Sequence, residues 1–350
     1  MNLKILLLPG DGIGVDVTRA AVEVLEAVVK KFNHTLEFSE GLIGGIAIHK
    51  TGGPLPQDTI DKALAADATL MGAVGLPEFD NVTPSKRPER GLLDIRKAMG
   101  VYANLRPVRT WPALVESSPL KNHLVEGTDM IIVRELNGGL YYGEPRSIDD
   151  FRAVNTMSYT RPEIERVSRK AFKLAQSRRK KVTSVDKSNV LENSQLWRKV
   201  ITDVAREFPD VELDHLIVDN CAMQLVLNPR RFDVLVTENL FGDILSDEGA
   251  VLAGSIGMLP SASLGDDKGL YEPVHGSAPD IAGQNKANPL GAISSMAAML
   301  EYSFGLLKEA AAVNTAIGRV LDSGHVTADL KPKGAPATTD QVARAVVDAL

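Results

Sequence analysis

Three segments in the second half of the chain repeat one pattern, in which a short apolar run precedes a charged residue and then a helix-like stretch. The runs are residues 182–185, 215–218 and 232–236, and apolar residues recur at helical spacing after each. Runs of this length suit buried strands. Strands that alternate with helices favour a layered α/β architecture.

The N-terminal segment follows the same plan. An apolar run at residues 5–8 ends at Pro9 and Gly10, and the stretch that follows has helical spacing as far as Phe32. The glycine turn between them does not match G-x-G-x-x-G, because Val15 stands three residues after Gly12. The turn is therefore weak evidence for a Rossmann dinucleotide site.

Composition sets outer limits on the class of protein. The chain has 350 residues, 44% of them hydrophobic and 24% charged, with a net charge of −6 and one cysteine. This length suggests two domains, and the mild negative charge argues against binding to nucleic acid or to a membrane surface. The single cysteine excludes a disulfide framework. No segment looks like a signal peptide or reaches the ~20 apolar residues of a membrane span. We therefore expect a cytoplasmic protein.

Several charged residues follow the predicted strands. In open α/β sheets, ligands bind beyond the carboxyl ends of strands, where Lys187 and Asp219 would lie. Asp243 and Asp247 are four residues apart and would share one face of a helix. Carboxylate oxygens suit Mg²⁺ or Mn²⁺, so Asp219, Asp243 and Asp247 form a candidate metal site. The alternatives are a solvated helix surface for the pair and a helix cap for Asp219.

Three arginines stand in unusual settings. Arg96 ends Glu-x-Gly-Leu-Leu-x-x-Arg, Arg106 stands in Asn-Leu-Arg-Pro, and Arg134 follows an apolar run at residues 130–133. The guanidinium group binds carboxylates through a planar fork of donors. If the three converge, they would bind a dianionic substrate; each alone could be a surface ion pair.

Seven motifs, in order along most of the chain, resemble the isopropylmalate dehydrogenases within the isocitrate/isopropylmalate family of β-decarboxylating dehydrogenases. They occupy residues 89–96, 104–107, 134–146, 185–191, 243–248, 254–263 and 275–283. The resemblance implies two α/β domains around mixed sheets and not a Rossmann fold. It places a cofactor-side domain at residues 1–101 plus 254–350, and a central domain with the dimer interface at residues 102–253.

The resemblance also implies roles for the residues. The substrate would be bound by Arg96, Arg106, Arg134, Glu89, Leu92, Leu93, Val190 and Asp219. Tyr141 and Lys187 would be catalytic, and Asp219, Asp243 and Asp247 would hold one Mg²⁺ or Mn²⁺. Members of the family are homodimers with shared active sites. The resemblance therefore implies that Lys187 and Asp219 reach each active site from the partner chain.

The cofactor implied by the resemblance is NAD. It would lie along His275, Gly276, Ser277, Ala278, Pro279, Asp280 and Asn288. An acidic side chain accepts hydrogen bonds from ribose hydroxyls and repels a 2′-phosphate, so Asp280 favours NAD over NADP. The Gly10 turn would be a structural turn near this cofactor segment.

The expected reaction is NAD-dependent oxidative decarboxylation of 3-isopropylmalate to 2-oxo-4-methylpentanoate, a step of leucine biosynthesis. Leu92, Leu93 and Val190 would offer an apolar surface to the isopropyl group. The family's usual residues are replaced at Leu76, Glu78 and Phe79, which leaves open a paralogue acting on D-malate, tartrate, homoisocitrate or another alkylmalate. A non-catalytic sensor that binds dicarboxylate or metal is the alternative from another class.

Overall fold

The structure is a computed structural model that describes residues 1–350, apart from the side chain of Ser85. The chain forms two compact units. Unit 1 comprises Met1–Val101, Trp111–Ser117 and Ala253–Leu350, and unit 2 comprises Tyr102–Thr110 and Ser118–Leu252. The chain therefore passes between the units more than once.

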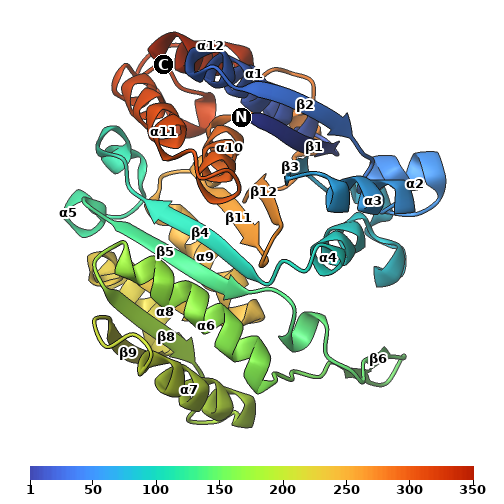
Figure 1. The fold of residues 1–350 in the computed structure, drawn as a ribbon, viewed down its shortest axis with the longest axis vertical. Coiled ribbons are helices and arrows are strands. Elements are labelled where there is room, and N and C mark those ends of the chain that lie inside the picture. Colours follow the sequence, from blue (N-terminus) through green and yellow to red (C-terminus); the bar gives the residue numbers. More distant parts are fainter. The chain divides into compact units, whose positions relative to one another are not determined.

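Unit 1 is built on five strands in the order β2-β1-β3-β12-β11. Strand β1 pairs in parallel with β2 and β3, β12 is parallel to β3, and β11 is antiparallel to β12. Figure 1 shows the first and last segments of the chain, in blue and red, side by side in this unit. The bounds are β1 (Asn2–Gly10), α1 (Gly14–Phe32), β2 (Thr35–Glu40), α2 (Gly45–Thr51), α3 (Gln57–Ala65), β3 (Ala68–Ala73), α4 (Pro88–Ala98), β11 (Pro260–Leu264), β12 (Gly269–Pro273), α10 (Leu290–Tyr302), α11 (Leu307–Asp322) and α12 (Thr339–Ala349).

Unit 2 is built on five strands in the order β4-β5-β10-β8-β9. Only the β4–β5 pair among them is antiparallel. Helices α6 and α7 pack together on one face of this sheet, and α8 and α9 pack together on the other. The bounds are β4 (Ala103–Arg109), α5 (Asn122–Val125), β5 (Asp129–Glu135), β6 (Ser147–Ile148), β7 (Ala153–Val154), α6 (Arg161–Gln176), β8 (Lys181–Asp186), α7 (Glu192–Ala205), β9 (Glu212–Ile217), α8 (Val218–Leu227), β10 (Val234–Thr237) and α9 (Asn239–Leu252).

Helix α6 illustrates how local sequence sets these elements. The Thr160 side chain and the Glu163 side chain form a reciprocal capping box at its start, with Pro162 in the first turn. Its buried residues, which include Ile164, Val167 and Ala171, recur at helical spacing. The cap fixes where the helix begins, and the apolar stripe fixes the face that packs on the sheet.

The predicted α/β class with mixed sheets is confirmed. Helix α7 ends at Ala205, so Phe208 lies beyond it, with its ring stacked on Phe172 at 5.2 Å. Phe208 precedes a proline, and a proline disfavours helical conformation in the residue before it. Strand β9 ends at Ile217, so Asp219 lies in the first turn of α8 and not in a strand-to-helix loop.

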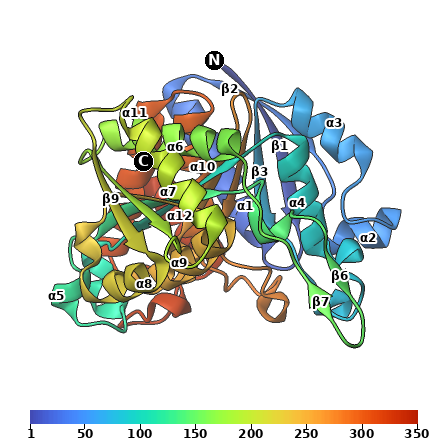
Figure 2. The same cartoon turned by 90° about the horizontal axis from the view of Figure 1, so that it is seen from below.

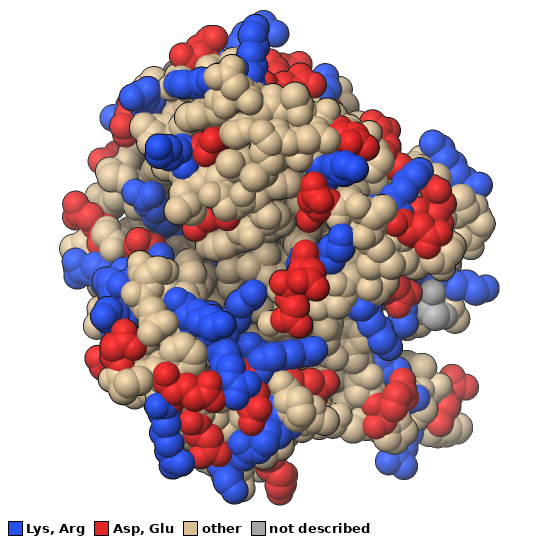
Figure 3. Space-filling view, in the orientation of Figure 1, with Lys and Arg blue, Asp and Glu red and all other residues tan. Residues whose placement is uncertain are grey.

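Figure 3 shows Lys and Arg side chains interspersed with Asp and Glu over the visible face. Over α6 and α7 many of these charges are paired, as between Arg161 and Asp203 and between Arg169 and Glu207. Among the described residues, no helix is long and apolar enough to cross a membrane.

Candidate active site

Four of the predicted site residues meet in unit 2 at the carboxylate of Asp243, in the second turn of α9. Arg134, near the end of β5, places Nη1 2.5 Å from Oδ1 of Asp243. The hydroxyl group of Tyr141 donates to Oδ2 at 2.7 Å, and Nη1 of Arg106, on the neighbouring strand β4, lies 3.6 Å from Oδ1. Antiparallel pairing of β4 with β5 brings both arginines to one end of the sheet. One carboxylate thus gathers two guanidinium groups and a phenol.

Arg106 is held in place by further polar side chains. It is 8% exposed, its Nε donates to Oδ1 of Asn104 at 2.8 Å, and its Nη1 donates to Oγ of Ser246 at 2.7 Å. The carboxylate of Asp247 lies 3.8 Å from the same Nη1 and is 64% exposed. Asp243 and Asp247 therefore do share one face of α9, as their spacing predicts.

Tyr141 keeps its proton over the physiological range. Burial, together with the hydrogen bond to Asp243, raises the pKa of Tyr141 to about 12. The guanidinium group of Arg134 lies 5.6 Å from the centre of the Tyr141 ring and acts in the opposite direction. A phenol of this kind donates hydrogen bonds and protons and is a poor base at neutral pH.

Asp243 is ionised in this setting. Burial pushes its pKa upward, but Arg134, the Tyr141 hydroxyl and Arg106 outweigh burial and hold the pKa below its usual value. Asp243 and the exposed Asp247 together offer hard, anionic oxygen donors, which fit a divalent cation such as Mg²⁺ or Mn²⁺.

The third expected metal ligand, Asp219, forms a separate pair with Lys187. Nζ of Lys187 lies 2.5 Å from Oδ1 of Asp219, and this hydrogen bond lowers the pKa of the carboxyl group. Within the described part of one chain, no three His, Cys, Asp or Glu side chains form a metal-binding group. A single copy therefore does not unite Asp219 with Asp243 and Asp247.

The remaining substrate residues lie mostly on α4 in unit 1. Arg96 is 6% exposed and its Nη2 lies 2.5 Å from Oε1 of Glu272, on β12. Leu92 and Leu93 are half-buried, and Glu89 is exposed one turn before them. Residues three and four apart share one face of a helix, so these side chains project together. Val190, in unit 2, is 61% exposed.

The expected cofactor segment in unit 1 is tied to the N-terminal glycine turn. The carbonyl oxygen of Ser277 accepts from the backbone amide of Ile13 at 2.7 Å. A Cβ atom at Gly12, whose φ is +55°, would lie 2.0 Å from that oxygen. The Ser277 hydroxyl donates to the carbonyl of Gly75 at 2.6 Å. Glycine at position 12 is therefore required by this close approach.

Two side chains flanking this segment are buried and polar. Asn288 donates to Asp329 at 3.0 Å and accepts from the backbone amide of Leu290. Nε2 of His275 is buried without a hydrogen-bond partner among the described residues, and burial lowers the pKa of this ring. A buried, unpaired ring nitrogen fits contact with a bound ligand. The rest of the segment is more open, and Pro279 and Asp280 are exposed in the 3-10 turn Pro279–Ile281.

Sequence reasoning missed several residues that build the site. Asn104 and Ser246 bind Arg106, and Asn239 binds Arg134. Glu272 binds Arg96. In unit 1, the buried carboxylate of Asp11 accepts from the amides of Gly45, Ile46 and Gly75. Asn239 lies between a predicted strand, residues 232–236, and the predicted helix that holds Asp243, which was a positional signal. Asn104 and Ser246 lie within two of the motifs, Asp11 lies in the N-terminal glycine turn, and Glu272 carries no sequence signal.

The loop that carries Leu76, Glu78 and Phe79, where this chain departs from the family's usual residues, packs on α2. A Cβ atom at Gly45 would lie 2.5 Å from Leu76 and 3.2 Å from the Phe79 ring. The His49 ring lies 5.4 Å from that of Phe79, and its Nε2 is 2.6 Å from Glu78. The three departures from the usual family pattern therefore contact one helix together.

Comparisons with known proteins agree with this arrangement. Residues 4–346 match the family described as isocitrate/isopropylmalate dehydrogenase. Relatives named 3-isopropylmalate dehydrogenase include one from Priestia megaterium, 56% identical over 99% of this chain and 95% of the relative, and one from Geobacillus kaustophilus, 58% identical over 95% and 91%. The solved isocitrate dehydrogenase of Methylococcus capsulatus has a TM-score of 0.89 and 38% identity, covering 99% of both chains.

The fold and the relatives together place the chain among the β-decarboxylating dehydrogenases, a class of oxidoreductases. The chain belongs to the isocitrate/isopropylmalate dehydrogenase family.

Proposed function

We propose that the chain catalyses NAD-dependent oxidative decarboxylation of 3-isopropylmalate to 2-oxo-4-methylpentanoate, the reaction of leucine biosynthesis. The observation that carries the proposal is the joint contact of Arg106, Arg134 and Tyr141 with Asp243. The relatives at 54–58% identity bear the name of this activity, which supports the choice of substrate.

The proposed site residues of the chain each have a defined task in this reaction. Arg106 and Arg134, with Arg96, bind the substrate carboxylates. Lys187 takes the proton from the C2 hydroxyl, and Tyr141, which is protonated at neutral pH, returns a proton to the carbon that loses CO₂. Buried polar partners hold Arg106 and Arg134 before substrate arrives, which lowers the cost of ordering them.

Asp243 and Asp247 would hold the divalent cation together with Asp219. When bound, Mg²⁺ or Mn²⁺ would polarise the substrate hydroxyl and carboxylate oxygens. The cation would bind a carboxylate that is ion-paired with Arg134 and accepts a hydrogen bond from the Tyr141 hydroxyl. We expect Mn²⁺ titration of Asp243→Asn to show a loss of affinity of at least about 10-fold.

NAD would lie along the segment from His275 to Asn288 and would accept the hydride. The exposed carboxylate of Asp280 would face the ribose hydroxyls and disfavour NADP. Asp280→Lys should lower the ratio of kcat/KM with NAD to kcat/KM with NADP by at least about 10-fold. A wild-type enzyme that already prefers NADP would contradict this assignment.

We also propose a homodimer in which the partner subunit's Lys187 and the partner subunit's Asp219 complete each site. Two surfaces of unit 2 support this. Met223 and Leu227 on α8, and Ile244 on α9, are 55%, 61% and 59% exposed. Exposed apolar groups of this kind mark protein interfaces. The hairpin of β6 and β7, visible in Figure 2, exposes Ile148 by 81% and Phe151 by 99%.

Mixing two inactive variants tests the shared site. In a hybrid dimer of Lys187→Ala with Tyr141→Phe, one of the two sites has both a normal lysine and a normal tyrosine. After denaturation and refolding together, activity should recover to about a quarter of wild type, since about half of the dimers are hybrids. Sites built within one subunit would give no recovery.

A substrate panel tests the reaction itself. NADH formation with Mn²⁺ is measured for 3-isopropylmalate, isocitrate, homoisocitrate, D-malate and tartrate. The half-buried Leu92 and Leu93 favour an isopropyl group by about 1–3 kcal/mol, so kcat/KM should be at least about 10-fold higher for 3-isopropylmalate. A higher value for isocitrate would favour the activity named for the Methylococcus capsulatus enzyme. Lack of NADH with every acid would favour a binding protein.

A further inference from the structure

The side chain of Asn239, the first residue of α9, uses both of its donors and its acceptor. Asn239 is 1% exposed. Its Oδ1 accepts from Nε of Arg134 at 2.9 Å, and its Nδ2 donates to the carbonyl oxygens of Leu136 at 3.2 Å and Gly138 at 3.1 Å. Only an amide supplies one acceptor and two donors in so small a side chain.

One end of this amide orients Arg134. The guanidinium group is held at Nε by Asn239 and at Nη1 by Asp243. Two contacts on a planar group fix the direction of its plane, and bidentate recognition of a carboxylate depends on that plane. Asn239 thus sets the direction in which Arg134 meets a substrate carboxylate.

The other end holds the turn that leads to Tyr141. The carboxylate of Glu135 accepts from the amides of Asn137 and Gly138 at 2.9 and 2.8 Å, which secures the same turn from another side. A Cβ atom at Gly138 would lie 2.4 Å from the ring of Tyr159, so the turn also packs closely on an aromatic ring. The carbonyls bound by Asn239 are three and five residues before Tyr141.

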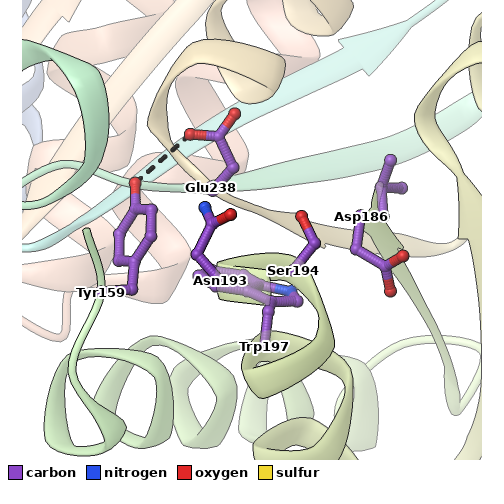
Figure 4. A pocket seen from close by; sticks show the side chains of 7 residues that line it. Tyr159, Asp186, Asn193, Ser194, Trp197 and Glu238 are labelled. Carbon is purple, nitrogen blue, oxygen red and sulfur yellow. Dashed lines mark hydrogen bonds between the residues drawn. The ribbon is translucent and has the colours of Figure 1, made fainter. Parts of the chain in front are cut away.

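The backbone of Asn239 is fixed as well. Its amide donates to the hydroxyl oxygen of Tyr159 at 3.0 Å, and that hydroxyl points toward Glu238, with an oxygen–oxygen distance of 3.4 Å (Figure 4). The carboxylate of Glu238 accepts from the amides of Leu240 and Phe241. A carboxylate at this end of a helix is stabilised by the free amides there. The start of α9 is therefore a rigid base for the Asn239 side chain.

We propose that Asn239 is a positioning residue that couples Arg134 to Tyr141. One amide sets the guanidinium direction and the place of the turn that carries the phenol, and so it fixes the distance between the carboxylate-binding group and the proton donor. This inference rests on the proposed function for the roles of Arg134 and Tyr141, and its geometry is tested separately below.

Asn239→Asp separates the two ends of the amide. The carboxylate has the same shape and still accepts from Arg134, but it cannot donate to the carbonyls of Leu136 and Gly138. We expect kcat to fall at least about 10-fold while the KM for 3-isopropylmalate stays within about threefold, because uniform substrate binding is retained. Asn239→Ala loses both ends and should also raise KM. If Asn239→Asp lowered kcat and raised KM to the same extent as Asn239→Ala, the proposal would be overturned.

A double-mutant cycle shows whether the effect acts through Tyr141. Once the hydroxyl is absent in Tyr141→Phe, its position no longer matters, so adding Asn239→Asp should lower kcat by less than about twofold. The same fold-change in both backgrounds would mean that Asn239 acts elsewhere, and would refute the coupling. If Asn239→Asp fails to fold, Asn239→Ala is placed in the same cycle. Asn193→Asp is the matched control, because Asn193 lies by Tyr159 but on α7 (Figure 4).

Hydrogen exchange tests the geometry without any substrate. In Asn239→Asp, amides in residues 136–143 should exchange at least about 10-fold faster than in wild type, while Asn193→Asp leaves them unchanged. Unchanged exchange in Asn239→Asp would overturn the proposal. Failure of wild type to oxidise 3-isopropylmalate would instead refute the proposed function and leave this measurement to decide the positioning role.

Discussion

The Tyr141 hydroxyl donates a 2.7 Å hydrogen bond to Asp243, so the proposed proton donor and a proposed metal ligand are in direct contact. A cation at Asp243 and the proton on Tyr141 therefore share one carboxylate. Any change in the charge of Asp243 is transmitted to the phenol, because Asp243 contributes to raising the pKa of Tyr141.

Tyr141→Phe should lower kcat by at least about 100-fold, the scale expected when a general acid is lost. KM should change much less, since the ring keeps its place beside Arg134. Steady-state NADH formation and a thermal melt check this prediction. Tyr142→Phe, which removes the hydroxyl of the next residue, is the control and should stay within about twofold of wild type. Near-normal turnover of Tyr141→Phe would remove the acid role.

Gly12→Ala should raise the KM for NAD by at least about 10-fold, because the new Cβ would lie 2.0 Å from the carbonyl of Ser277 and displace the proposed cofactor segment. Gly52→Ala is the matched control. Gly52 also has positive φ, at +84°, but nothing lies within 4 Å of its Cβ position. It should lose about 1 kcal/mol of stability from backbone strain and keep its KM. Equal KM values in the two variants would contradict the steric explanation.

The pH dependence of stability should carry a contribution from Glu135. Burial raises its pKa from 4.5 to about 7, against hydrogen bonds from Asn137 and Gly138 and the charge of Arg166. The folded chain thus binds this proton more tightly than the unfolded chain. The contribution is fully present below pH 4.5 and is lost as pH rises through about 7.

Glu135→Gln removes that proton linkage. The difference in unfolding free energy between wild type and Glu135→Gln should therefore shrink by about 2 to 3 kcal/mol from pH 5 to pH 8. Urea denaturation at several pH values measures it. A difference that is constant across this range would show that Glu135 does not titrate there.

Asp233→Ala should destabilise the fold by about 3 kcal/mol, the scale for removing one partner of a buried ion pair. Asp233 is 1% exposed and accepts from Nε of Arg178 at 2.8 Å. Asp210→Ala is the control, because that carboxylate is 42% exposed beside Lys180 and should cost less than about 1 kcal/mol. Urea unfolding compares the two, and equal losses would contradict a buried role for Asp233.

The sequence predicted the fold class and the clustering of Arg106, Arg134, Tyr141 and Asp243. The resemblance to the isopropylmalate dehydrogenases implied that Arg106, Arg134 and Tyr141 share a site with Asp243. Arg106 lies within β4 and Tyr141 in a 3-10 turn, where no local pattern marks them. The spacing of Asp243 and Asp247 alone placed both on one helix face. Their side chains do lie near the same arginine, at 3.6 and 3.8 Å from Arg106.

Contacts between distant segments could not be predicted in the same way. Asn239 binds residues about 100 positions earlier, and nothing in the local pattern of a single asparagine after a strand announces such partners. Residues 178–180 belong to the basic turn between α6 and β8. Arg178 in this turn donates hydrogen bonds to Asp129, the first residue of β5, and to Asp233, which directly precedes β10. Such pairings depend on the tertiary arrangement, which cannot be read from the spacing of hydrophobic residues or from composition.

Asp11 gathers the amides of Gly45, Ile46 and Gly75 through main-chain atoms alone. These bonds use backbone amides, which every non-proline residue has, so they require no polar side chain at Leu76, Glu78 or Phe79. Leu76, Glu78 and Phe79, where this chain departs from the family's usual residues, come directly after Gly75. Substitutions at these three positions can therefore accumulate while the backbone at Gly75 stays hydrogen-bonded to Asp11 and to Ser277 of the proposed cofactor segment.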